Sequence, residues 1–473
     1  MVFNSLTFVV FFLIVVCFHY APFSWQVKKF NLLIFSYIFY AAWNPPFILL
    51  LWASTVVDWW MAKLIYREER PRQRKRLLLV SLALNLGMLS YFKYGAFALK
   101  NWQALMGAIG VAYVPPAWDI VLPIGISFYT FVTLSYTLDV YLKRAKPGDS
   151  FLDFALFVTY FPHLVAGPIV RPIDLMPQFA TPRVASRPLF LWGLALIVLG
   201  LFQKVVVADT LLAEVAEDVF GARQPLPPLD AWAGVIAFSG QIFADFAGYS
   251  TCAIGVSLCL GFSLPVNFRY PYAAIGFSDF WRRWHISLST WLRDYLYIPL
   301  GGNRGSRWRT YRNLMLTMLL GGLWHGANWT FVVWGGLHGL YLSGERFLRE
   351  RFGWKGEPRS LVPKLLVALL TYLLVCITWV FFRAPDFAAA GKLLADMAGL
   401  RPSAPPIIAT VPLALTAITM GAMFTAHWLM RDRELEDVVA RRPAWLVGLV
   451  VGVMAAAVIL AQGEGSAFIY FQF

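Results

Sequence analysis

One histidine stands out because it lies inside an apolar stretch that helix-breaking residues interrupt. His325 lies in residues 314–342, and the 13 residues from Arg312 to His325 would carry its ring about 20 Å into a hydrocarbon core about 30 Å thick. The interrupting residues are Gly321, Gly322, Gly326 and Asn328. An imidazole takes up and releases a proton near neutral pH, so an ionisable side chain at that depth indicates a functional site. The alternative is a structural histidine that is hydrogen-bonded to a nearby carbonyl.

A second histidine, His285, lies in a segment that mixes aromatic residues with arginines. Residues 280–300 contain three tryptophans and two tyrosines beside Arg282, Arg283 and Arg293. This mixture predicts a helix that lies in the membrane interface, with aromatic residues on one face and arginines on the other. Gly301 and the residues that follow it predict a break after that helix.

The apolar stretch around His325 has basic residues on both sides. Arg307, Arg309 and Arg312 precede it, and Arg346 and Arg349 follow it. Because basic loops face the cytoplasm, both ends of the stretch are predicted there. The stretch should therefore enter the bilayer and return, and its irregular backbone should be enclosed by protein or line a water-filled cavity.

The elements that must position these histidines are predicted to be transmembrane helices. The chain has 473 residues, of which 59% are hydrophobic and only 14% are charged, and apolar runs recur along its whole length. We expect an all-α polytopic membrane protein with about 10–12 transmembrane helices, plus re-entrant and interfacial helices, in a single domain over residues 1–473. The net charge of +14 is explained by basic loops between apolar runs rather than by nucleic-acid binding. The cysteines have no metal-ligand spacing, so no metal site is predicted.

The direction of threading follows from the same basic loops. Residues 2–23 form an apolar span with no basic residue before it, and Lys28 and Lys29 follow it. This span is predicted to be a retained helix that begins outside and ends in the cytoplasm. The last apolar span, residues 446–460, then leads outward, so residues 463–473 are predicted to be an extracytoplasmic tail.

Five segments together resemble the membrane-bound O-acyltransferase family, and within it the branch that modifies bacterial cell-surface polymers such as alginate, cellulose and teichoic acid. The segments are residues 122–129 (LPIGISFY), 161–168 (FPHLVAGP), 245–250 (DFAGYS), 279–295 (DFWRRWHISLSTWLRDY) and 321–328 (GGLWHGAN). They occur in the family's order and are spread over most of the chain. After residue 250 the chain continues with Thr251 and Cys252, where alginate-type relatives usually have an acidic residue. This departure leaves alginate and cellulose as two alternative polymers.

The resemblance implies an enzyme that catalyses O-acetyl transfer for exopolysaccharide modification. The donor would be a cytoplasmic thioester, acetyl-CoA, with no other cofactor bound. The implied partners are a periplasmic SGNH-type acetyltransferase or another acyl-accepting protein, the polysaccharide-synthesis machinery and the lipid bilayer. The implied location is the bacterial inner membrane. A transporter or flippase is the alternative, because broken helices at the midplane also occur in transporters.

The resemblance also assigns roles to residues. His325 carries the family's catalytic histidine, and a neutral imidazole there is suited to act as general base on an acceptor hydroxyl. His285 carries the second family position, and it would hold the donor carbonyl or orient the acceptor. Asn328 and Trp324 are candidates for the oxyanion site or the pocket wall, although Asn328 would equally satisfy a helix end.

Four further residues are candidates for donor binding or for carrying the acyl group. Arg304, Arg307 and Arg309 could bind the donor phosphates, or they could simply mark the cytoplasmic face. Tyr470 lies in a C-terminal FIYFQF sequence that resembles an acyl-carrying tyrosine motif of a small partner in the D-alanylation system. It is therefore predicted to carry the acetyl group, with an aromatic interface anchor as the alternative.

Overall fold

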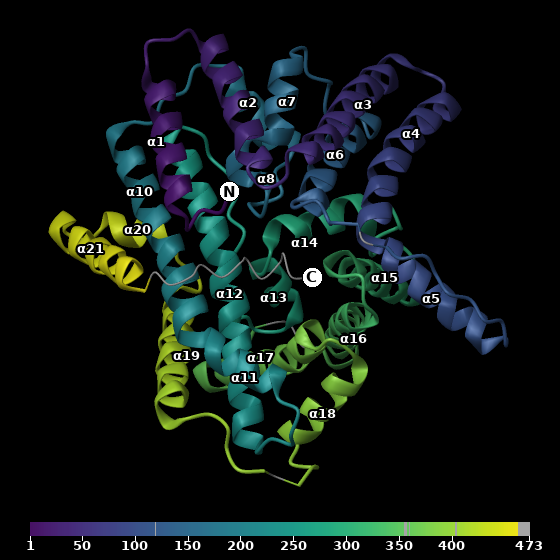
Figure 1. Cartoon of the computed structure of the whole chain (residues 1–473), viewed down its shortest axis with the longest axis vertical. Coiled ribbons are helices and arrows are strands. Elements are labelled where there is room, and N and C mark those ends of the chain that lie inside the picture. Colours follow the sequence, from purple (N-terminus) through teal and green to yellow (C-terminus); the bar gives the residue numbers. More distant parts are fainter. Residues whose placement is uncertain (119, 354–356, 359, 403, 462–473) are drawn as a thin grey trace. The chain divides into compact units, whose positions relative to one another are not determined.

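The structure is a computed structural model that describes residues 1–118, 120–353, 357–358, 360–402 and 404–461. Within these residues the regular structure is entirely helical, without a strand (Figure 1). The prediction of an all-α fold is confirmed. The chain divides into two compact units, of which the first comprises Met1–Leu194 with Ala253–Pro265 and the second comprises Ala195–Cys252 with Val266–Phe473.

The first unit contains the N-terminal helices. They are α1 (Leu6–Tyr20), α2 (Trp25–Ala41), η1 (Pro45–Phe47), α3 (Ile48–Arg67), α4 (Pro71–Leu89), η2 (Ser90–Tyr94), α5 (Gly95–Ala108), α6 (Ile126–Tyr141), α7 (Phe151–Thr159), α8 (Phe161–Leu164), α9 (Pro172–Phe179) and the start of α10 (Arg187–Leu201). Helices α3, α4 and α6 pack around the fully buried carboxylate of Asp58, which accepts hydrogen bonds from Asn85 at 2.7 Å and Thr137 at 3.1 Å. Buried polar groups need such partners, so this network fixes how the three helices pack.

The second unit contains every candidate site residue that the structure describes. Its elements are η3 (Phe202–Leu212), α11 (Ala213–Gly221), most of α12 (Pro228–Cys259), η4 (Pro271–Ala273), α13 (Phe277–Arg283), α14 (Ile286–Leu292), η5 (Arg293–Tyr297), α15 (Arg307–His325), α16 (Trp329–Phe352), α17 (Leu361–Arg383), α18 (Phe387–Met397), α19 (Thr410–Met430), α20 (Leu435–Ala440) and α21 (Ala444–Leu460). Its core is rich in aromatic side chains, and Trp284, Trp334 and Trp379 are among the largest that are almost fully buried.

Six helical segments in the described residues are long and apolar enough to cross a membrane. They are Pro45–Arg67, Pro71–Ala108, Arg187–Gly221, Pro228–Cys259, Leu361–Arg383 and Thr410–Met430, and Leu6–Tyr20 and Ala444–Leu460 are shorter apolar helices. Six is fewer than the 10–12 expected. Several predicted spans fold as shorter helices, such as α6 with 16 residues, and α15 begins with three arginines in its first six residues.

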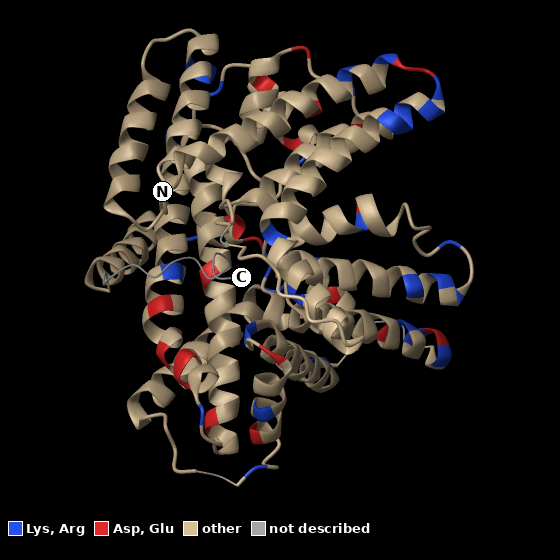
Figure 2. Ribbon diagram, turned by 45° about the vertical axis from the view of Figure 1, so that its right-hand side comes forward, with Lys and Arg blue, Asp and Glu red and all other residues tan. Residues whose placement is uncertain are grey.

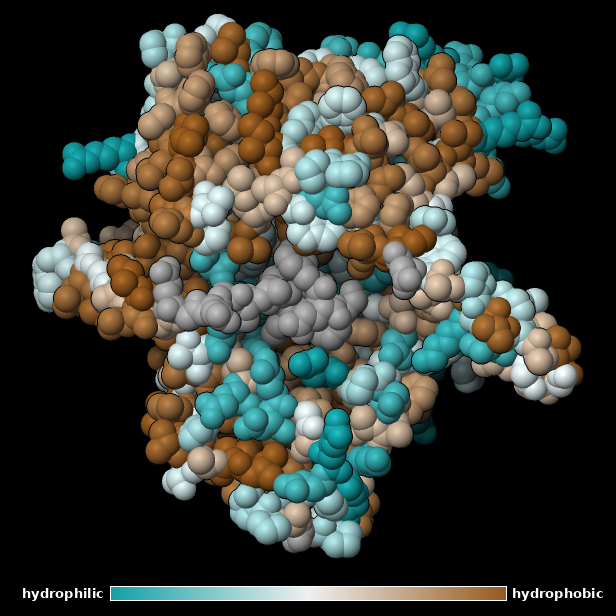
Figure 3. Space-filling view, viewed as in Figure 1, coloured by the Kyte–Doolittle hydropathy of each residue, from teal (hydrophilic) through white to brown (hydrophobic). Residues whose placement is uncertain are grey.

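The surface is that of a multi-pass membrane protein. Apolar side chains cover much of the face shown in Figure 3, and large exposed apolar residues occur along α1, α3, α17, α19 and α21. Lysine and arginine gather near helix ends and loops, while long stretches of helix carry no charge (Figure 2). Soluble proteins rarely expose apolar surface on this scale, and basic residues at helix ends are typical of the positive-inside rule.

Helices α17 and α19 define two opposite faces of the second unit. Glu357, which precedes α17, is paired with Lys364 at 2.7 Å and with Arg431, at the end of α19, at 3.1 Å. The start of α17 and the end of α19 therefore lie at the same face. Because both helices are long enough to span a membrane, residues 384–402 and 404–409, which follow α17, lie toward the opposite face.

Candidate active site

His325 is the last residue of α15, and a three-residue connection leads from it into α16. The break predicted in this stretch is confirmed, but it lies at Gly326–Asn328 only. Gly321 and Gly322 lie inside α15. A Cβ atom on Gly322 would come within 2.2 Å of the Phe331 carbonyl oxygen, and one on Gly335 would come within 2.2 Å of the Met318 carbonyl oxygen. These glycines therefore allow the two helices to pack backbone against backbone, as a hairpin that carries His325 near its tip.

His285 lies at a break between two short helices. The prediction of one continuous interfacial helix over residues 280–300 is wrong, because α13 ends at Arg283 and α14 begins at Ile286. His285 has φ 43° and ψ 55°, in the left-handed region, which costs a residue with a side chain about 1–2 kcal/mol. This turn buries the imidazole completely, and such strained conformations are often found at functional sites.

The structure brings the two predicted histidines together. The ring centroids of His285 and His325 are 6.4 Å apart. Two hydrogen bonds in series span about 5–6 Å, so a single small group could contact both rings. Trp324 lies beside both, with centroid distances of 6.2 Å to His285 and 4.9 Å to His325. Its role as a pocket wall stays a prediction. We refer to His285 and His325 as the histidine pair.

Aromatic side chains surround the histidine pair. Trp334 and Phe382 pack against His325 at centroid distances of 5.0 and 5.5 Å, and Phe246 packs against His285 at 4.7 Å. His325 is only 4% exposed. Apolar surroundings of this kind exclude water, which strengthens every electrostatic interaction within the site.

Asn328 has a structural role at the start of α16. Its side-chain oxygen accepts a hydrogen bond from the Thr330 amide at 3.2 Å, as a helix N-cap does. Its amide nitrogen donates to the Pro385 carbonyl at 2.8 Å. These contacts match the helix-end alternative, and the oxyanion role stays a prediction without a supporting contact.

The three arginines proposed for donor binding lie at the other end of α15 from His325. Arg304, Arg307 and Arg309 are all exposed, and Arg307 forms an ion pair with Glu350 at 3.2 Å. The 18 residues from Arg307 to His325 correspond to about 27 Å of helix. The structure therefore does not bring these arginines to the histidine pair, and donor binding there stays a prediction. Tyr470 lies outside the described residues.

Sequence reasoning missed the residues that hold and enclose the histidine pair. Asn267 accepts a hydrogen bond from His285 at 3.1 Å, and Trp334 and Phe382 come from helices whose apolar pattern is equally typical of a lipid-facing span. No spacing in the sequence connects Asn267 to His285, 18 residues later. The signal that could have singled it out is an amide residue between apolar ones in a segment of predicted irregular structure.

His338 and Asp245 of this unit each have a structural partner. His338 forms a hydrogen bond of 3.0 Å with Thr378, and the Trp334 ring contacts both His338 and His325. The intramembrane carboxylate of Asp245 forms an ion pair with Lys204, which also pairs with Asp209 at 2.9 Å. Buried charges require such partners.

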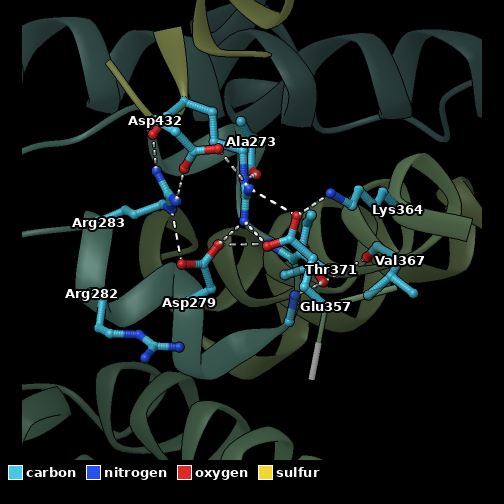
Figure 4. A network of polar contacts seen from close by, with 12 residues as sticks. Ala273, Asp279, Arg282, Arg283, Glu357, Lys364, Val367, Thr371 and Asp432 are labelled. Atoms are coloured by element: carbon cyan, nitrogen blue, oxygen red, sulfur yellow. Dashed lines mark hydrogen bonds and ion pairs between the residues drawn. The ribbon is translucent and has the colours of Figure 1, made fainter. Parts of the chain in front are cut away.

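A network of ion pairs holds the helix that precedes His285. Arg283 of α13 is paired with Asp279 at 3.0 Å, as Figure 4 shows. Arg431 is paired with both Asp279 and Glu357 at 3.1 Å. We call these four residues the ion network. Burial alone would raise the pKa of Asp279, but the Ile275 amide and the two guanidinium groups outweigh it and lower that pKa below its usual range.

The start of α13 is held in a different way. The buried carboxylate of Glu345, on α16, accepts hydrogen bonds from the backbone amides of Phe277 at 2.5 Å and Ser278 at 3.1 Å. These are first-turn amides that lack partners within their own helix. The segment that presents His285 is thus fixed at the start of α13 by α16 and at its end by the ion network.

A cavity lies next to the tip of the hairpin. It has a volume of about 400 Å³, and Pro385, which accepts the hydrogen bond from Asn328, is one of its lining residues. Arg223 and Lys392 also line it. Ala384, Pro385 and Lys392 lie in the segment after α17, so this cavity lies toward the face opposite the ion network.

A family model and several named relatives match this chain. The family model described as MBOAT, membrane-bound O-acyltransferase family, matches residues 77–355, which include both histidines. The chain is 44% identical over 398 residues to a Pseudomonas aeruginosa protein named probable alginate O-acetylase, covering 84% of this chain and 75% of that protein.

Two further relatives carry different names. A Helicobacter pylori peptidoglycan O-acetyltransferase is 38% identical over 400 residues, covering 79% of this chain and 74% of that protein. A Streptococcus thermophilus teichoic acid D-alanyltransferase is 30% identical over 294 residues, covering 55% and 68%. All three names describe acyl transfer, which confirms the prediction of an acyltransferase over that of a transporter.

Proposed function

Because this chain belongs to the membrane-bound O-acyltransferase family, we propose that it transfers acetyl groups from a cytoplasmic thioester to a polysaccharide outside the inner membrane. The family and the named relatives support a membrane O-acyltransferase that acts in polysaccharide acylation. The donor, the side of each substrate and the polymer are our proposals.

The observation that carries the proposal is the histidine pair, with ring centroids 6.4 Å apart. In the proposed reaction His325 takes the proton from an acceptor hydroxyl, whose oxygen attacks the thioester carbonyl carbon. The new C–O bond forms, the C–S bond breaks, and the proton passes from His325 to the departing thiolate. A positioned general base of this kind contributes about 10²–10⁴-fold to a rate.

The polymer is proposed from the relatives. Alginate is the first choice, because the proteins named alginate O-acetylase share up to 44% identity with this chain. Cellulose is the alternative. We propose that a periplasmic SGNH-type acetyltransferase or another acyl-accepting protein receives the acetyl group, with Tyr470 as a carrier on the way, and that the polysaccharide-synthesis machinery works beside it.

The sides of the membrane are proposed from charge and topology. The ion network and the basic ends of α15 and α16 would face the cytoplasm and acetyl-CoA. The cavity beside Pro385 would then face outward, where an acceptor could approach the tip of the hairpin. From the basic residues that flank the first and last apolar spans, we also propose that both chain termini lie outside the cytoplasm.

The test is acetyl transfer from radiolabelled acetyl-CoA by the purified full-length protein in lipid nanodiscs, to alginate or cellulose oligosaccharides with the proposed periplasmic acceptor protein present. The H325A variant should lose transfer by at least about 100-fold while its thermal unfolding stays within the range of the wild type. The matched control is His427→Gln, because His427 is also buried but contacts Tyr272 rather than the pair. Equal transfer by H325A and wild type would refute the proposal.

A further inference from the structure

We propose that Asn267 is a positioning residue that keeps the proton of His285 on Nδ1, so that Nε2 accepts a hydrogen bond from a second hydroxyl group of the acyl acceptor, next to the one that is acetylated. The inference rests on the proposed function and deepens it. Of the two roles that the sequence left open for His285, it selects orientation of the acceptor over binding of the donor carbonyl.

The backbone places Asn267 directly beside the turn at His285. The Ile286 amide donates to the Asn267 carbonyl at 2.9 Å, and the Arg269 amide donates to the Arg283 carbonyl at 2.9 Å. The segment that contains Asn267 is therefore hydrogen-bonded on both sides of His285. Asn267 itself is only 1% exposed, so its side chain is held within the protein interior.

The contacts of Ser287 identify which atom of the Asn267 amide faces His285. The backbone N–H of Ser287 approaches this atom at 3.2 Å, and the Ser287 hydroxyl approaches it at 2.9 Å. A backbone N–H can only donate a hydrogen bond. The atom must therefore be an acceptor, which makes it the carbonyl oxygen, Oδ1, and not the amide nitrogen.

The same oxygen then determines the tautomer of His285. Nδ1 of His285 lies 3.1 Å from Oδ1 of Asn267, and a nitrogen that faces an acceptor must donate. Complete burial favours the neutral imidazole over the charged one, and a neutral imidazole has only one N–H group. Nδ1 therefore carries the proton, and Nε2 carries a lone pair.

This tautomer limits what His285 can do in the reaction. A ring nitrogen with a lone pair cannot donate to a thioester carbonyl, but it can accept from a hydroxyl. The hydroxyl that attacks the thioester gives its only proton to His325. His285 would therefore orient the sugar acceptor through a second, neighbouring hydroxyl. The hydrogen bonds of Asn267 also help to offset the strain of the left-handed turn at His285.

The first test observes the tautomer directly. The protein has six histidines, and ¹⁵N-histidine labelling of the full chain in nanodiscs, with H285Q to assign the signal, reports which ring nitrogen is protonated. We expect an unprotonated Nε2 in the wild type and in Asn267→Asp, which keeps an acceptor oxygen. We expect this preference to be lost in Asn267→Leu. A protonated Nε2 in the wild type would overturn the proposal.

The second test measures acetyl transfer in the same variants. Hydrogen-bond partners of metal-binding histidines are worth about 10–100-fold. By analogy, N267L should lose about as much in kcat/KM for the acceptor while KM for acetyl-CoA is unchanged. N267D should recover most of the activity. Thr290→Val is the matched control, because its hydroxyl bonds only within α14. An N267L variant as active as T290V would overturn the positioning role.

The two tests separate this inference from the proposed function. If the wild type shows the expected tautomer but transfers no acetyl group, the proposed function and the acceptor role of His285 are both refuted. The tautomer assignment of His285 would still stand. A wild-type protein that transfers acetyl groups equally well with Leu at position 267 refutes the inference alone.

Discussion

The histidine pair and the ion network lie on either side of the same short segment but are stabilised by opposite kinds of contact. His285 is enclosed by aromatic rings, whereas Arg283, two residues earlier, is held by carboxylates. Ion pairs near water contribute stability that salt can screen, while apolar enclosure contributes an environment that excludes water. We call this difference a division of work: the ion network anchors the segment, and the aromatic rings exclude water from the site.

The largest expected effect is on the ion network. In Arg431→Met the carboxylates of Asp279 and Glu357 lose a partner. Because Asp279 is half-buried and Glu357 is exposed, the cost lies between about 1 kcal/mol for an exposed pair and about 3 kcal/mol for a buried one. We expect a Tm several degrees lower in nanodiscs, with acetyl transfer per folded molecule nearly unchanged. Arg433→Met is the control, because Arg433 is exposed and close in sequence. A loss of transfer without a loss of Tm would contradict the division of work.

The next effect concerns the glycine contacts of the hairpin. In Gly335→Ala the new Cβ would collide with the Met318 carbonyl oxygen, so α15 and α16 must separate and His325 must shift. Overpacking of this kind costs about 1–3 kcal/mol, and transfer should fall more than stability does. Gly344→Ala is the control, since nothing lies within 4 Å of its new Cβ. Equal transfer in both variants would show that the close packing does not position His325.

A smaller effect should appear in the response to acid. The pKa of Asp279 is lowered in the folded protein, so its contribution to stability is present above its unfolded pKa, about 3.9, and is lost as the pH falls through the folded value. Between pH 5 and pH 3 the wild type should therefore lose stability more steeply than Asp279→Asn does. Parallel stability curves for the two proteins would argue against an ionised Asp279 in the network.

The smallest effect is a difference in salt dependence. Screening lengths fall from about 10 Å at 0.1 M to about 3 Å at 1 M salt, so the Tm gap between the wild type and R431M should narrow as salt is added. The gap between the wild type and G335A should stay constant, because it arises from steric contact. If added salt narrowed the Tm difference from the wild type equally for R431M and G335A, the two regions would not differ in the kind of contact that stabilises them.

The sequence was sufficient for the fold class, and it singled out two histidines whose rings the structure brings together. The reason is physical. Apolar runs and basic loops report the membrane environment directly, and an imidazole beside helix-breaking residues is costly enough to indicate a site. The path of the backbone was less predictable. Gly322 looked like a helix break, yet it serves close helix packing, because glycine allows both and only the neighbouring helix decides between them.

The surroundings of the site could not be predicted because they depend on contacts between distant segments. Trp334 and Phe382 become part of the site only when α16 and α17 pack beside α15. His285 looked like part of a continuous helix, and its left-handed turn depends on a partner, Asn267, that helical periodicity does not reveal. Local patterns report burial well, but they carry little information about which buried groups meet.

The π-helical segment η3 has a consequence for how this chain tolerates insertions and deletions. Lys204 and Asp209 are five residues apart, and their ion pair forms because a π-helix brings residues at that spacing onto one face. Losing one residue between them would restore an ordinary helical pitch and leave the two charges four residues apart, still on one face, whereas adding one residue would turn one charge away from the other by roughly 100°. An insertion there would leave the hydropathy almost untouched, yet it would uncouple a charge cluster inside the membrane, so this segment should tolerate deletions better than insertions.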